Sequence, residues 1–192
     1  MTIFAPCPRL SAQRGTTAVE FALTAMVFMT FIFGLIELSR AMYLWNTMAE
    51  VTHRAARAAA ITDFTDSAAM DMVRRKALFR STAGGLPMGG DITDAHLTVS
   101  HLRSNLAPVS PMPTCPAQNI INCAADPDGA SCIRFVQVRL CVPGGAGCTR
   151  VPYTSMLALD SLFSGSFHFP TFATVTPAGS LGYRPGATNV CP

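Results

Sequence analysis

The sequence predicts an α+β protein in which one long amino-terminal transmembrane helix continues into a small disulfide-stapled domain with a few antiparallel strands. Three observations lead to this prediction. The chain of 192 residues contains one long apolar segment, helix-forming residues follow it directly, and nearly all cysteines lie in the last part of the chain beside alternating stretches. We therefore expect a leader at 1–15, the long helix at 16–60 and an exported, cysteine-containing domain at 61–192.

The leader carries basic charge and precedes the apolar segment. It contains Arg9 and Arg14 and no acidic residue. A secretory signal peptide instead has its apolar region, of about 7–15 residues, before the cleavage site. The leader does not fit that pattern. Its basic charge favours the cytoplasm, which would send the rest of the chain to the other side of the membrane.

The long helix is predicted from an apolar half and a helix-forming half. No charged residue occurs from Phe21 to Ile36. Reaching back to Thr16, a helix of about 21 residues covers ~31 Å, enough to cross a bilayer core. The next stretch, up to Ala60, has no Gly or Pro and is rich in Ala, Leu, Met and Arg, which are good helix formers. One helix should therefore continue to about Ala60, and its outer half needs a surface to pack on.

The outer half of this helix carries aromatic and charged residues at informative positions. Tyr43 and Trp45 fall where an aromatic belt would meet the membrane surface. Glu50 and Arg54 are four residues apart, so their side chains are expected to meet on the helix surface.

The first part of the outer domain should contain a helix and two strands. A helix is predicted over Ser67–Thr82, with Asp66 as its N-cap and the glycines from Gly84 as its stop. "AHLTVSHL" (Ala95–Leu102) and "IRFVQVRLCV" (Ile133–Val142) alternate in apolar character. This alternation indicates strands.

The remaining segments are predicted to be a loop, a helix and an edge strand. Ala107–Cys132 is rich in Pro, Asn, Asp and Cys and is expected to be a crosslinked loop. "PYTSMLALDSLFSG" (Pro152–Gly165) fits a short amphipathic helix. "FHFPTFATVTP" (Phe167–Pro177) fits a last strand at the sheet edge, because Pro170 has no backbone N–H to donate.

The cysteines indicate disulfides. One of the seven, Cys7, precedes the apolar segment, and the others follow it: Cys115, Cys123, Cys132, Cys141, Cys148 and Cys191. An even set on one side of a membrane is typical of an oxidising compartment. The sequence contains no C-x-x-C pair, the spacing that would indicate a zinc site. Cys141 and Cys148 flank a Gly-rich turn and are the first expected pair. Cys115 with Cys123 or Cys132 is the second.

Other sequence features argue against catalysis and nucleic-acid binding. The formal charge of +3 is too small to indicate a nucleic-acid partner, and no cofactor or metal motif is present. Asp160, Ser164 and His168 are close in sequence but lack a nucleophile elbow. His96 and His101, five apart on an expected strand, would point to opposite faces. We expect a noncatalytic protein without a cofactor or metal.

An acidic residue, Glu20, lies just inside the apolar segment. A carboxylate at the centre of a span costs about 2.5–3.5 kcal/mol on insertion scales, so it usually has a partner and a function. The simpler interpretation is a side chain that reaches back to the cytoplasmic headgroups and has no specific role.

The surroundings of Glu20 resemble the class III signal of type IV prepilins. A basic leader ends at Gly15, Glu20 is the fifth residue after that glycine, Phe21 follows, and the apolar helix comes next. In particular, "RGTTAVEFAL" from Arg14, "ELSR" from Glu37 and the later "AARAAA" resemble the amino-terminal region of TadE-like proteins. The subtypes TadE, TadF and TadG share this beginning.

The resemblance implies a minor pseudopilin or an assembly factor of a Tad-type (tight adherence) pilus. A prepilin peptidase would cut between Gly15 and Thr16, while Glu20 and Phe21 would set the register of assembled subunits. The carboxylate would pair with the new Thr16 amine of a neighbour, because an unpaired buried charge is costly. Implied partners are the peptidase, other pilins and pseudopilins, and Tad assembly proteins.

The implied location is the bacterial inner membrane, with a cytoplasmic amino terminus and a periplasmic or extracellular domain. The alternative is an uncleaved, signal-anchored periplasmic module that uses its disulfide-rich domain for binding or adhesion. Cleavage after Gly15 and dependence on Glu20 distinguish these two interpretations.

Overall fold

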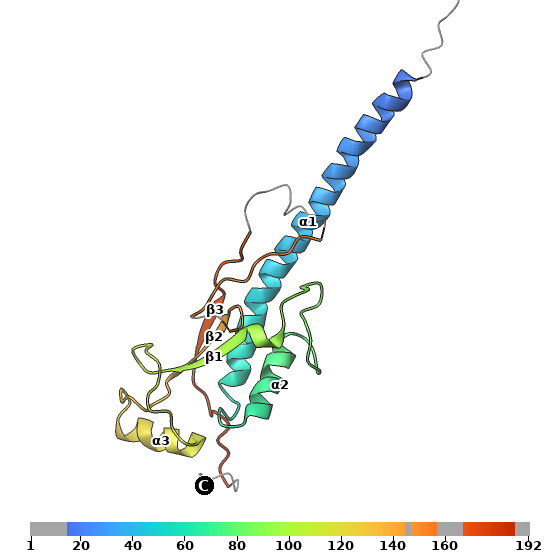
Figure 1. The fold of residues 1–192 in the computed structure, drawn as a ribbon. Coiled ribbons are helices and arrows are strands. Elements are labelled where there is room, and N and C mark those ends of the chain that lie inside the picture. Colours follow the sequence, from blue (N-terminus) through green and yellow to red (C-terminus); the bar gives the residue numbers. More distant parts are fainter. Residues whose placement is uncertain (1–14, 145–146, 157–166, 187–192) are drawn as a thin grey trace, which may run out of the picture. The chain divides into compact units, whose positions relative to one another are not determined.

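The computed structural model describes residues 15–144, 147–156 and 167–186. The elements, in order, are helix α1 (Thr16–Ala59), helix α2 (Ser67–Ala77), the 3-10 helix η1 (Asp94–His96), strand β1 (Leu97–Leu102), helix α3 (Pro116–Ala125), strand β2 (Phe135–Leu140) and strand β3 (Ala173–Pro177) (Figure 1). The chain divides into two units between Ser39 and Arg40. We call the second, residues 40–192, the globular unit. The predicted fold class, a long apolar helix followed by a small antiparallel and disulfide-bonded domain, is confirmed.

Helix α1 runs without a break for 44 residues, as predicted. Within the globular unit it buries side chains at spacings of three and four residues, namely Leu44, Met48, Val51, Ala55, Ala56 and Ala59. This spacing places them on one face of the helix. The outer half of the helix therefore packs on another surface, as its composition predicted.

That other surface is an antiparallel sheet with the strand order β1-β2-β3. Leu97 of β1 lies opposite Leu140 of β2. The central strand β2 buries Val136, Val138 and Leu140, which alternate along it. Both predicted strands exist. The predicted edge strand exists too, but it begins only at Ala173, after Pro170.

The core lies between α1 and the sheet and contains two clusters of buried side chains. Val138 packs in one cluster with Met48 from α1. Val136 belongs to the other, together with Ala59 from the end of α1 and Leu181 from the segment after β3. The buried side chains that recur with a helical period in α1 thus pack against those that alternate along β2.

Helix α2 begins where the sequence predicts and ends earlier. A carboxylate oxygen of Asp66 accepts a hydrogen bond from the Ala69 N–H at 3.0 Å, the contact expected of an N-cap. The predicted end at Thr82 is wrong, because the helix stops at Ala77.

The early stop is made by Phe79 rather than by a glycine. Phe79 has φ +61°, and the Arg80 N–H donates to the Arg75 carbonyl at 3.0 Å, closing a left-handed turn that usually contains glycine. The Arg54 guanidinium lies 4.4 Å from the centre of the Phe79 ring. This contact replaces the expected ion pair of Arg54 with Glu50, which does not form within the described parts of the chain.

Two predictions in the last part of the chain need correction. The expected loop Ala107–Cys132 contains helix α3, which Cys115 caps and Pro116 opens. Proline is well suited to the first helical position, whereas cysteine is not a usual N-cap, so the start was not recognised. The helix expected over Pro152–Gly165 does not form up to Met156, and the rest of that range lies outside the described residues.

Candidate functional site

The first half of α1 exposes large apolar side chains around its whole circumference. They include Val19, Phe21, Leu23, Met26, Val27, Phe28, Met29, Phe31, Phe33, Leu35 and Ile36. Within the described residues, α1 is the one helix long and apolar enough to cross a membrane. Its most apolar window has a mean hydropathy of 2.1, and none of that window is buried inside the chain. An exposed apolar surface of this extent is typical of a segment that contacts a membrane or another protein.

The predicted cleavage residues lie at the very start of this helix. Thr16 is its first residue, and the carbonyl of Gly15 accepts a hydrogen bond from the Val19 N–H at 3.4 Å. Gly15 is exposed, and a Cβ added to it would meet nothing within 4 Å. Among the described residues, neither crowding nor a left-handed backbone therefore requires a glycine at position 15.

The predicted register residues follow directly on the helix surface. Phe21 is 74% exposed. Glu20 is exposed as well, and its backbone carbonyl accepts a hydrogen bond from the Thr24 hydroxyl at 2.9 Å. Within the described residues its carboxylate has no hydrogen-bond or ion-pair partner. Within the described parts of the chain, a carboxylate therefore stands without a partner in an apolar surface.

The structure brings the predicted residues together as one small region. Thr16 and Glu20 are four residues apart on a helix, so they lie on the same face about one turn from each other. Gly15, Glu20 and Phe21 are all accessible from outside the chain. This arrangement suits recognition of the Gly15–Thr16 peptide bond and pairing of the carboxylate with a cation from another molecule.

A buried arginine at the start of the globular unit was not predicted as an anchor. Arg40 is only 8% exposed. Its Nε donates to the Met88 carbonyl at 3.2 Å, and its Nη1 donates to the Thr154 carbonyl at 2.8 Å. The same nitrogen lies 3.3 Å from the Tyr153 hydroxyl, and the guanidinium lies 5.4 Å from the centre of that ring. One side chain thereby binds two loops that are far apart in sequence.

The disulfides agree with one predicted pair and contradict the other. Cys141 and Cys148 are joined, with their Cα atoms 4.9 Å apart, as predicted. Cys123 and Cys132 are joined to each other, so the expected pairing of Cys115 with either of them is wrong. Cys115 is disulfide-bonded as well. The remaining candidate, Cys191, lies outside the described residues, as does Cys7.

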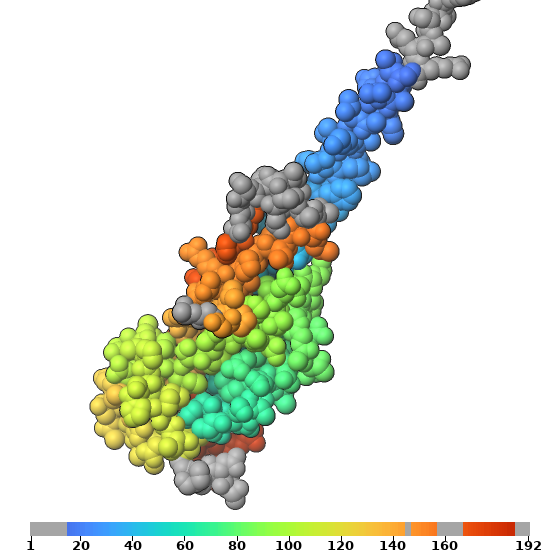
Figure 2. Space-filling model, viewed as in Figure 1, coloured from blue at the N-terminus to red at the C-terminus, as the bar shows by residue number. Residues whose placement is uncertain are grey.

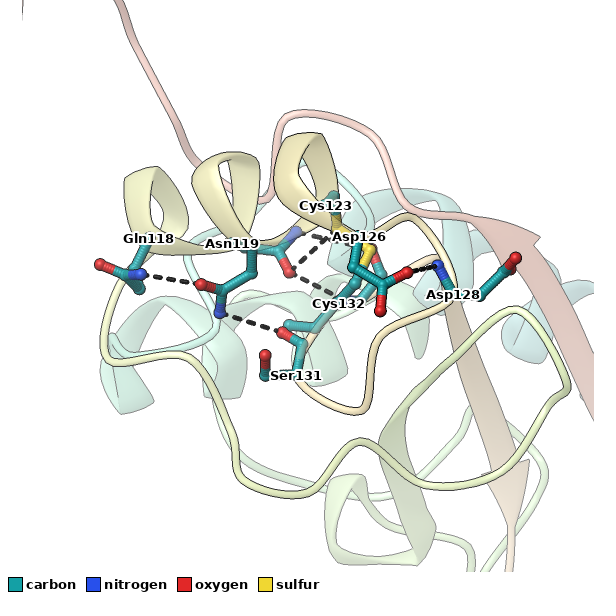
Figure 3. Close-up of a disulfide and its surroundings, with 9 residues drawn as sticks. Gln118, Asn119, Cys123, Asp126, Asp128, Ser131 and Cys132 are labelled. Atoms are coloured by element: carbon teal, nitrogen blue, oxygen red, sulfur yellow. Dashed lines mark hydrogen bonds between the residues drawn. A yellow bond between two sulfur atoms is a disulfide. The ribbon is translucent and has the colours of Figure 1, made fainter.

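The Cys123–Cys132 pair is explained by an asparagine that holds the chain beside α3 (Figure 3). The buried Asn119 side chain accepts a hydrogen bond from the Ile133 N–H at 2.8 Å and donates to the Ile133 carbonyl at 3.4 Å. Asn122 also donates to the Ser131 carbonyl at 3.3 Å. These contacts bring residues 131–133 alongside the face of α3 that carries Asn119 and Asn122, where Cys123 bonds to Cys132.

The histidines have structural surroundings. His96 ends η1, where its Nδ1 lies 3.1 Å from both the backbone nitrogen and the hydroxyl of Thr93, so it is not on the strand where it was expected. Burial lowers the pKa of His96, partly offset by its hydrogen bond to Thr93 and by the charge of Asp91. His101, on β1, packs 5.4 Å from the ring centre of Phe64, and burial lowers its pKa.

The other residues considered for chemistry do not form a site in the described parts of the chain. His168 forms a strand bridge with Pro152, whereas Asp160 and Ser164 lie outside the described residues. Among the described residues, no three His, Cys, Asp or Glu side chains are grouped so that they could hold a metal ion.

Comparison with known proteins matches the segment that contains the site. Residues 15–57 match the family model of TadE-like proteins, which confirms the resemblance over these residues and indicates a role related to the Tad pilus. The family is one of pilus assembly proteins that are generally noncatalytic. Neither the curated proteins nor the solved structures gave a match.

Proposed function

We propose that this protein is a noncatalytic minor pseudopilin or assembly factor of a Tad-type pilus, anchored in the bacterial inner membrane by the first half of α1 and cut after Gly15 by a prepilin peptidase. The observation that carries the proposal is Glu20, an exposed carboxylate without a partner in the described chain, within a wholly exposed apolar helix. The match over residues 15–57 supports the same function.

Cleavage would create a partner for Glu20, which has none among the described residues. Hydrolysis of the Gly15–Thr16 amide consumes one water, leaves a carboxylate on Gly15 and frees the α-amine of Thr16. An α-amine has a pKa of about 7.7–8.0, so much of it carries a positive charge at neutral pH. In an assembly of apolar helices, the Thr16 amine of one subunit and the Glu20 carboxylate of the next would neutralise each other.

Such a pair would also set how neighbouring helices are staggered. Four residues of α-helix rise about 6 Å, so pairing Glu20 with a neighbour's Thr16 offsets the two helices by about one turn. Any other offset leaves a carboxylate and an amine unpaired among apolar side chains, which is costly. The pair would thus select one register for incoming subunits.

The glycine at position 15 supports recognition by a peptidase. Because an added Cβ would meet nothing within 4 Å, packing in the described parts of the chain gives no reason for a glycine there. A tight peptidase site around the scissile bond supplies one. Gly34 is a suitable control, because it lies within α1, which Gly15 directly precedes, and a Cβ added to it would also meet nothing within 4 Å.

The first experiment is intact-mass and amino-terminal analysis of the membrane-extracted protein, with and without a co-expressed prepilin peptidase. We expect a chain that begins at Thr16 only when the peptidase is active. Gly15→Val should abolish this processing and Gly34→Val should leave it intact. A chain that keeps its leader beside an active peptidase would refute the proposal and favour the uncleaved, signal-anchored module.

A second experiment tests the role of the carboxylate separately from processing. Glu20→Gln preserves the shape of the side chain and removes its charge, and Glu50→Gln does the same at an exposed position of the globular unit. We expect Glu20→Gln to be cut normally but lost from the isolated pilus or assembly complex, whereas Glu50→Gln is retained. Equal retention of both variants would contradict the pairing of Glu20 with the Thr16 amine.

A further inference from the structure

The end of the globular unit around Arg40 exposes large side chains from three separate segments. Met42 and Tyr43 come from α1, Met88 from the loop after α2, and Met156 from the segment before residue 157. We call these four residues the collar. Figure 2 shows the green segment that contains residue 88 and the orange segment before residue 157 at the same end of the globular unit.

Arg40 places the two loop residues of the collar at one level. The carbonyl that its Nε binds at 3.2 Å belongs to Met88 itself. The carbonyl that its Nη1 binds at 2.8 Å belongs to Thr154, two residues before Met156. The two loop segments of the collar are therefore held by a buried side chain, while all four collar residues remain exposed.

We propose that the collar lies in the headgroup layer of the bilayer that α1 spans, so that lipid is a docking surface for the globular unit. This inference rests on the membrane anchoring in the proposed function and is independent of cleavage after Gly15. We choose the bilayer as the partner of the collar because α1 continues unbroken from its exposed apolar half through residue 40.

The lengths agree with this placement. The stretch from Thr16 to Ile36 covers ~31 Å, about the thickness of the hydrocarbon core, and the headgroup layer adds roughly 5–7 Å on each side. That layer corresponds to about three to five further residues at about 1.5 Å each, which reaches the level of Arg40. Met42 and Tyr43 follow about 9–10 Å beyond Ile36, and helical side chains tilt toward the amino terminus, so theirs lean back toward this layer. The Met88 loop is hydrogen-bonded to Arg40 itself.

The chemistry of the collar also fits an interface. Tyrosine is enriched at the boundary between hydrocarbon and water, where its ring is apolar and its hydroxyl is hydrated. Methionine side chains are flexible and adapt to an irregular apolar environment. The Arg40 guanidinium is bound by protein carbonyls. Placing Arg40 in the headgroup layer therefore does not expose an unsatisfied charged group to lipid.

The experiment uses single tryptophans in the full chain. Trp45 is the one natural tryptophan and is replaced by Phe, after which Phe31→Trp, Met88→Trp or Ile61→Trp is introduced. Met88 and Ile61 are matched controls, since both are 64% exposed. Ile61, just beyond the end of α1, lies ~30 Å along the helix axis from Arg40. Each protein is reconstituted in vesicles of phosphatidylethanolamine and phosphatidylglycerol with lipids brominated near the headgroup.

We expect strong quenching and blue-shifted emission from Phe31→Trp, quenching of Met88→Trp close to that level, and little quenching of Ile61→Trp. If Phe31→Trp is quenched and Met88→Trp is quenched no more than Ile61→Trp, the docking of the collar is overturned while the anchor stands. If Phe31→Trp itself is not quenched, the membrane anchoring fails and the inference fails with it.

Discussion

The glycines after β3 provide the sharpest test of the packing in the globular unit. The chain returns there to the end of α1, where the Ala60 carbonyl accepts hydrogen bonds from the Gly179 and Leu181 N–H groups at 3.0 and 3.1 Å. Gly182 follows with φ +87°, and a Cβ added to it would lie 2.6 Å from the Asp63 backbone nitrogen. Gly182→Ala is therefore the perturbation.

A second glycine of the same segment separates the two costs of this change. Gly186 has φ +78°, but a Cβ added to it meets nothing within 4 Å. Both alanine variants bear the cost of a left-handed backbone, about 1–2 kcal/mol. Only Gly182→Ala must also move backbone against backbone, and such overpacking costs about 1–3 kcal/mol. We expect losses of about 2–5 kcal/mol for Gly182→Ala and about 1–2 kcal/mol for Gly186→Ala.

The assay is denaturant unfolding of the detergent-solubilised full chain, followed by the fluorescence of Trp45. That ring lies edge-on to Phe172 in the globular unit, with ring centres 5.6 Å apart, so its emission reports the unfolding of this unit. The midpoint of Gly182→Ala should fall well below that of Gly186→Ala. Equal midpoints, or a less stable Gly186→Ala, would refute the close approach of Gly182 to Asp63.

Two further predictions concern buried polar groups. Asn119→Ala should lower the free energy of unfolding by about 1–3 kcal/mol, since the Ile133 N–H loses its acceptor, and the same unfolding assay measures this. Burial lowers the pKa of His101, so below about pH 6.5 the unfolded chain binds more protons than the folded one. Stability should therefore be highest above that pH and fall as the pH drops. His101→Gln should flatten the decline, whereas replacing the exposed His53 by Gln should not.

Local patterns sufficed for part of the candidate site. Gly15, Glu20 and Phe21 could be recognised because their spacing is short and they stand at the start of one apolar helix. The structure adds that Gly15 has open space around it and that the Glu20 carboxylate has no partner within the described chain. Arg40 could not be recognised as an anchor, because the carbonyls that it binds are 48 and 114 residues away.

The sequence by itself determined the long helix, the alternating strand β2 and the disulfide between Cys141 and Cys148. Each depends on residues that are close along the chain. An unbroken run of helix formers sets the course of α1, and alternation places Val136 and Val138 on one face of β2. A short Gly-rich turn brings the two cysteines together. Such periods and turns can be recognised without knowing which distant residues they contact.

Only the tertiary structure decided where α2 ends and which cysteine Cys132 meets. The turn at Phe79 is covered by Arg54 from α1, and Asn119 holds Ile133 beside α3. In both cases a side chain from another part of the chain satisfies or covers a local conformation that its own sequence does not favour. The physical reason is that several local conformations differ little in free energy, and long-range contacts of a few kcal/mol select among them.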